Sequence, residues 1–213
     1  MPHICLLLSG AALLLNGLAT LGLLPRRDAA VFSLVTGAVQ LVLGVSYLSS
    51  DAGASLLTAA GMFLFGTTYA YSGLDNLLNL GSKGLGWFCG MVAVVGLLLA
   101  ATWVAVDPLL AVLWLCWSAL WTLLFVSMAL RMGRLDPFTG WALVLTSQVT
   151  ATLPAFLGLA GVWPYEPAVA SLAAAFLVAL FVLARILARR GGPVPQRPAA
   201  IRGHGDTRRG ILP

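Results

Sequence analysis

Residues 108–131 read PLLAVLWLCWSALWTLLFVSMALR, a run with no charged residue before Arg131. A helix rises about 1.5 Å per residue, so about 20 apolar residues cross the hydrocarbon core of a bilayer. Strands of a membrane barrel would alternate apolar and polar residues, and this run does not alternate. Because lipid cannot hydrogen-bond to exposed backbone groups, the stretch predicts a transmembrane helix.

Six further stretches have the same character, which predicts an all-α membrane protein, a bundle of seven transmembrane helices. The predicted spans are 3–24, 29–50, 54–79, 85–106, 108–131, 138–162 and 167–188. Of the 213 residues only 9% are charged, against about 25% in soluble domains. We therefore expect lipid to cover most of the chain, as a multi-pass protein of the inner (cytoplasmic) membrane.

Every Lys and Arg falls on one side of this predicted topology, and the other side carries Asp51, Asp107 and Glu166 instead. The 12 basic residues are Arg26, Arg27, Lys83, Arg131, Arg134, Arg185, Arg189, Arg190, Arg197, Arg202, Arg208 and Arg209. Short loops rich in Lys and Arg stay in the cytoplasm. This predicts an N-terminus outside and a C-terminus in the cytoplasm. The basic net charge then reflects topology, and we expect no nucleic-acid partner.

Aromatic residues gather near the middle of two spans. Trp114, Trp117 and Trp121 stand at i, i+3 and i+7, which places them on one helix face. Trp prefers the membrane interface, yet Trp117 and Trp121 lie near mid-span, where their indole N–H groups need partners. Phe65 and Tyr69 share a face of the third span. Bulky packing and a solute path both remain open as explanations of these residues.

Few polar groups accompany these rings. The deep ones are Asn16, Gln40, Thr146 and Gln148, which either join helices or line a path. No Lys, Arg, Glu or His lies near the middle of a span, and we expect Asp75, near a span end, to meet Lys83 or interfacial water. With no nucleophile–base pair and no metal-ligand cluster, we predict no enzyme, cofactor or metal. A neutral aromatic interior suits a small uncharged polar solute.

At these residues the chain resembles the AmiS/UreI family of amide and urea channels, over roughly residues 4–162. Its loop and fourth-span start are similar to the amide-channel branch. The matching motifs are Leu13-Leu14-Leu15-Asn16-Gly17, Phe65-Gly66-Thr67-Thr68-Tyr69, Lys83-Gly84-Leu85-Gly86-Trp87-Phe88-Cys89, the three tryptophans of the fifth span, and Leu153-Pro154-Ala155. The tryptophan spacing and the Phe-Gly-x-Thr-Tyr run together make the resemblance fairly specific.

The resemblance implies a passive pore through each protomer of a homo-hexamer. Carried over by position, the constriction would comprise Phe65, Tyr69, Trp117 and Trp121. The pore lining would comprise Leu13, Asn16, Trp114 and Thr146. The family core would be a six-helix core over 1–162. Outside the resemblance, we expect an extra seventh helix over 163–188 and, from its Gly, Pro and Arg content, a disordered basic cytoplasmic tail over 189–213.

Three departures refine this expectation. The outer loop Asp51-Ala52-Gly53 is too short for the histidine-bearing loop of the acid-gated urea channels, so we expect no acid gating of that kind. Thr146 stands where those channels carry a buried glutamate, which favours amides, with urea as a further solute. The seventh helix has no counterpart in the six-span members. A secondary transporter of small polar solutes and a non-conducting structural subunit remain the alternatives.

Overall fold

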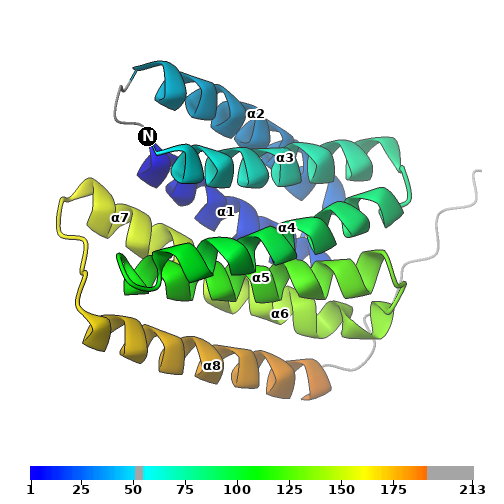
Figure 1. Ribbon diagram of the computed structural model, residues 1–213. Coiled ribbons are helices and arrows are strands. Elements are labelled where there is room, and N and C mark those ends of the chain that lie inside the picture. The colour runs from blue at the N-terminus through cyan, green and yellow to red at the C-terminus, as the bar shows by residue number, and fades with distance from the viewer. Residues whose placement is uncertain (51–54, 191–213) are drawn as a thin grey trace, which may run out of the picture.

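The computed structural model describes residues 1–50 and 55–190, and all regular structure in them is helical (Figure 1). This confirms the all-α prediction for the described residues. The loop Asp51-Ala52-Gly53 and the predicted tail beyond Arg190 lie outside them. The helices are α1 (Pro2–Thr20), α2 (Arg26–Ser50), α3 (Leu56–Leu78), α4 (Lys83–Trp103), α5 (Pro108–Met128), the short η1 (Gly133–Leu135), α6 (Asp136–Ser147), η2 (Gln148–Thr152), α7 (Leu153–Leu159) and α8 (Pro167–Arg190).

The long helices run side by side along one direction, with α1 lying behind α3 and α4 in the view of Figure 1. Two antiparallel pairs, α2 with α3 and α4 with α5, have the most extensive contacts, and α1 packs against α2, α6 and α7. Polar bonds tie α1 to α2: Asn16 Nδ2 donates to Ser33 Oγ at 2.8 Å, and Gln40 Nε2 donates to the Cys5 carbonyl at 2.8 Å. Both amides therefore join helices, as buried polar groups in membranes commonly do.

Six helical segments in the described part of the chain are long and apolar enough to cross a membrane. Taken in order, they contain α1, α2, α4, α5, the α6–η2–α7 segment and α8. Helix α3 is 23 residues long but is not among them, and its second half carries Thr68, Ser72, Asp75 and Asn76. The helix that departs from the apolar pattern is thus one that brings polar side chains into the bundle.

The sixth predicted span, 138–162, is a helix interrupted by a wider turn. Residues Gln148–Thr152 form a π-helical turn, in which the Leu153 N–H donates to the Gln148 carbonyl five residues earlier. Pro154 has no N–H to donate and its ring clashes with the carbonyl four residues before it. The π turn accommodates this proline, and π turns often occur at functional sites.

Asp75 differs from expectation in its partner. Its carboxylate accepts from the Ser82 backbone N–H at 3.0 Å and from the Ser82 hydroxyl, and only 3% of the residue is exposed. Ser82 has a left-handed backbone (φ 59°) and precedes α4 directly. Asp75 therefore holds the α3–α4 connection through Ser82, and no ion pair with Lys83 forms.

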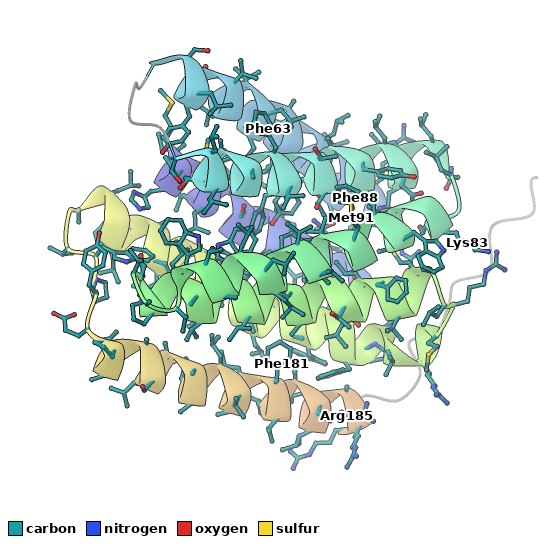
Figure 2. The ribbon with its side chains drawn as sticks, viewed as in Figure 1. Phe63, Lys83, Phe88, Met91, Phe181 and Arg185 are labelled. Carbon is teal, nitrogen blue, oxygen red and sulfur yellow. The ribbon has the colours of Figure 1, made fainter. Side chains whose placement is uncertain are left out.

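Helix α8 lies along the outside of the bundle, against α5 and α6 (Figure 1). Ala170, Leu177 and Ala184 are its buried residues, spaced seven apart on one face. Near its end, Phe181 packs against Phe138 of α6 with ring centroids 6.4 Å apart, and the Arg185 guanidinium lies 5.6 Å from the Phe138 ring (Figure 2). Its other face exposes large apolar residues, as expected of a helix that meets lipid.

The α2–α3 contact depends on small residues and gives a test of the fold. A Cβ on Gly37 would lie 2.6 Å from the Gly66 carbonyl oxygen and 2.8 Å from the Ala70 Cα. Gly37→Ala should therefore separate the two helices and lower the free energy of unfolding by about 1–3 kcal/mol, the usual cost of overpacking. The measurement is the thermal-unfolding midpoint in detergent. Ala38→Val, on the neighbouring exposed position, is the control, and equal midpoints for both variants would contradict the prediction.

Candidate functional site

Two cavities enter the bundle from opposite ends. The basic-end cavity, of about 360 Å³, has Arg26, Ser82 and Arg131 on its wall. The N-terminal cavity, of about 450 Å³, has Pro2, His3 and Asp107 on its wall. Among the described residues, Phe65 and Trp117 alone line both cavities. The two cavities therefore approach each other at these two rings.

An aromatic cluster fills the space between the cavities. Phe65 lies edge-on to Trp117, with ring centroids 5.0 Å apart at 90°, and its centroid lies 4.8 Å from that of Trp121. Trp114 stacks on Trp121 at 6.4 Å and 22°. All four side chains are at most 7% exposed. Edge-to-face and offset-stacked pairs in this distance range are favourable, so the cluster is a packed aromatic plug with defined ring planes.

Local sequence explains how α3 and α5 can bring these rings together. Gly61 lies one turn before Phe65 on α3, and a Cβ on it would be 2.9 Å from the Trp114 ring. The absence of a side chain at Gly61 thus leaves room for that indole. On α5 the i, i+3, i+7 spacing puts the three tryptophans on the face that meets Phe65.

The π turn supplies the partner that Trp117 needs. Its Nε1–H donates to Thr150 Oγ1 at 3.2 Å, and the Thr150 hydroxyl in turn donates to the Thr146 carbonyl at 2.9 Å. Thr146 itself is fully buried, its hydroxyl donates to the Ala142 carbonyl, and it lines neither cavity. The structure thus places Thr146 behind Trp117, and Thr150, which our sequence analysis missed, makes the contact.

Tyr69 and Asn16 reach the basic-end cavity from α3 and α1. The Tyr69 hydroxyl donates to the Ser9 carbonyl at 3.4 Å, and its ring centroid lies 6.2 Å from that of Phe65. Asn16 Nδ2 donates to Ser33 and to the Ala12 carbonyl at 2.8 Å. Both hydrogens of this amide are engaged, and no group in the described part of the chain donates to its oxygen, which is therefore available as an acceptor.

The predicted site residues divide between the two cavities. The structure places Leu13, Asn16, Phe65, Tyr69, Trp117 and Trp121 on the basic-end cavity, and Phe65, Trp114 and Trp117 on the N-terminal cavity. Of the eight predicted residues only Thr146 lines neither.

Further lining residues continue the same helix faces. On α3 the cavity wall includes Ser72 and Asn76, which extend the Phe65–Tyr69 face by one and two turns. On α5 it includes Leu124 and Met128, which extend the Trp117–Trp121 face. Carrying the 3.6-residue period past the aromatic residues would have found all four.

Charge is confined to the outer parts of the cavities. Arg26, Arg131 and Asp136 line the basic-end cavity, and His3 and Asp107 line the N-terminal one. None of the rings in the cluster carries a charge. Within the described residues no group of three His, Cys, Asp or Glu side chains could hold a metal ion. The arrangement is that of two polar entrances separated by a neutral aromatic barrier.

The chain is similar to known membrane transporters. Residues 1–162 match the AmiS/UreI family of transporters. A Rhodococcus erythropolis protein described as putative transporter protein AmiS2 is 44% identical over 200 residues, covering 92% of this chain and 97% of the relative. A Mycolicibacterium smegmatis protein described as a putative amidate substrates transporter is 34% identical, covering 85% and 87%.

The structural relative is more distant. The crystal structure of the Helicobacter pylori urea channel superposes with a TM-score of 0.69 and 25% identity, covering 77% of this chain and all of the channel. The Rhodococcus match covers 92% of the chain and so extends past residue 162, the end of the family match. The identity is higher to the AmiS2 and amidate-transporter relatives than to the urea channel, which confirms the expected branch. The chain belongs to the AmiS/UreI family of transporters.

Proposed function

We propose that this protein is a passive channel for small uncharged amides, with urea as a second solute. The observation that carries the proposal is the pair of cavities that enter from opposite ends and share Phe65 and Trp117. Family membership, the relative described as a putative amidate substrates transporter and the urea channel support the solute class. A small rotation of flat rings would open a slot that fits a planar solute better than a round one.

The polar groups on the basic-end cavity suit an amide's hydrogen bonds. Thr20 and Thr68 donate their hydroxyl hydrogens to carbonyls of their own helices. Hydroxyls bound in this way offer lone pairs to the cavity, as does the Asn16 oxygen. Acetamide and urea present more N–H donors than carbonyl acceptors, so a wall of acceptors can replace their water. The Trp121 indole N–H, which forms no hydrogen bond within the described residues, would donate to the solute carbonyl.

The same barrier would exclude ions. An ion that crosses the Phe65–Trp117–Trp121 cluster loses its hydration shell and meets no charged or carbonyl ligand to replace it. A neutral amide loses only a few hydrogen bonds, each with a net value of about 1 kcal/mol. Selectivity in this proposal comes from ring spacing and the lack of charge, and needs no coupled ion.

We further propose seven spans, with α3 as one of them, an N-terminus outside and the basic end in the cytoplasm of an inner-membrane protein. In support, all the Lys and Arg residues in the described part lie at one end of the bundle, where Lys83 and Arg185 are labelled in Figure 2. Helix α3 is polar on the face that lines the cavity, which would be covered by other helices rather than by lipid. By resemblance, protomers would form a homo-hexamer with one pore each.

The first test is stopped-flow light scattering of proteoliposomes given acetamide or urea gradients without an ion gradient. A channel should speed volume recovery several-fold over empty vesicles, without saturation as solute concentration rises. Saturation, or flux that requires a proton or sodium gradient, would instead indicate a secondary transporter. Flux equal to that of empty vesicles in every condition would indicate a non-conducting subunit.

Truncation at the cluster should change selectivity. Trp121→Ala removes a ring that packs on both Phe65 and Trp114, so the slot should widen. The permeability to butyramide relative to that for acetamide should then rise several-fold. The measurement is the ratio of the two permeabilities. Trp87→Ala is the matched control, because Trp87 is exposed on the outside of α4. If Trp121→Ala left flux and ratio at wild-type values, the constriction would lie elsewhere.

Loss of the Thr150 hydroxyl should make the Trp117 ring more mobile while the ring itself stays in the cluster. Thr150→Val removes the acceptor of the Trp117 N–H, and the lost bond should lower the unfolding free energy by about 1 kcal/mol. The butyramide-to-acetamide ratio should rise, by less than in Trp121→Ala. Thr122→Val serves as control, since the exposed Thr122 bonds only to its own helix. An unchanged ratio in Thr150→Val would show that this bond does not position the ring.

A further inference from the structure

Two arginines line the wide end of the basic-end cavity. Arg26 stands at the start of α2, and Arg131 follows α5 with a left-handed backbone (φ 54°). Each has a neighbouring basic residue, Arg27 and Arg134, that is outside the cavity wall. One arginine of each basic pair therefore lines the cavity, and the two share the same space.

Three acids lie near this end of the bundle: Asp28 in the first turn of α2, Asp75 and Asp136. Asp136, on the same cavity wall, accepts a hydrogen bond from Ser127. Asp75 is buried and bonded to Ser82. The described part of the chain contains no ion pair within 4.0 Å for either arginine. The cavity wall thus carries two arginines against one carboxylate, Asp136, and neither guanidinium is in direct contact with an acid, so both are available to an anion from solution.

The cavity wall that carries these arginines also has apolar side chains. Leu124 and Met128 continue the α5 face from Trp121 toward Arg131, and Leu85 lies on the same cavity. An anion with a short alkyl group could therefore place its charge at the arginines and its carbons against these side chains. The planar guanidinium fork matches a carboxylate, which can accept two parallel hydrogen bonds from it.

We propose that Arg26 and Arg131 form a binding site for short aliphatic carboxylates at the basic end of the pore. The inference rests on the proposed function, because such a carboxylate is the ionised product of hydrolysing the permeant amide. Carboxylic acids have a pKa of about 4 and are charged at neutral pH. The anion binds at the entrance, cannot pass the neutral aromatic cluster, and slows amide flux when it accumulates.

The test is inhibition of acetamide flux by propionate in vesicles of neutral lipid. Propionate is present at equal concentration on both sides of the membrane at pH 8, so that it forms no gradient. In the control, chloride takes its place at equal ionic strength, so that charge screening is the same. Propionate should slow flux in the millimolar range, with a dissociation constant of about 1 mM. In the double variant Arg26→Gln/Arg131→Gln, inhibition should weaken about tenfold relative to that variant's own uninhibited rate.

Matched variants and anions make the result decisive. Arg27→Gln/Arg134→Gln removes equal charge from the same end outside the cavity and should keep wild-type inhibition. Equal inhibition by phosphate, or inhibition that survives in Arg26→Gln/Arg131→Gln, would overturn the carboxylate site. Calorimetric titration of propionate into the full-length protein in nanodiscs tests the site without transport. If wild-type vesicles carried no acetamide while the arginine-dependent heat persisted, the proposed function would fail and the anion site would stand.

Discussion

The Phe65 and Trp117 rings pack at right angles, 5.0 Å between centroids, and the Phe65 ring also packs against Trp114 and Trp121. This contact joins α3 to α5 at the point where the cavities from the two ends meet. Aromatic pairs prefer a few geometries, so the cluster fixes how far apart these helices lie. The width of the space on either side depends on that distance, and Gly61 is needed for it because a side chain there would strike Trp114.

Membrane proteins must satisfy buried polar groups from within, and here that requirement organises the rest of the bundle. The Asn16 and Gln40 amides join α1 to α2, and the π turn of the sixth segment offers Thr150 to Trp117. Pro154 makes the π turn favourable, because it cannot donate to the carbonyl four residues earlier. A feature that would weaken an ordinary helix thereby brings a hydroxyl within hydrogen-bond distance of Trp117.

The distribution of charge complements the neutral centre. Charged residues of the cavities stay at the entrances, with Arg26 and Arg131 at one end and Asp107 at the other. Electrostatic interactions in a cavity with low-dielectric walls are stronger than in bulk water. In the proposed channel, the charged cavity ends would discriminate among charged molecules, and the aromatic cluster would select neutral ones by shape. Entry and passage would then be separate selection steps.

The sequence by itself determined the helical class, the positions of most helices and the segregation of basic residues, because apolar length and charge follow from composition along the chain. Periodicity also identified the faces of Phe65, Tyr69 and the three tryptophans. Tertiary structure alone decided that Thr150 rather than Thr146 meets the site, since a π turn rotates the following residues and no period predicts it. It likewise decided that Asp75 bonds Ser82, and that one arginine of each basic pair faces the cavity, because these depend on how separate helices approach each other in space.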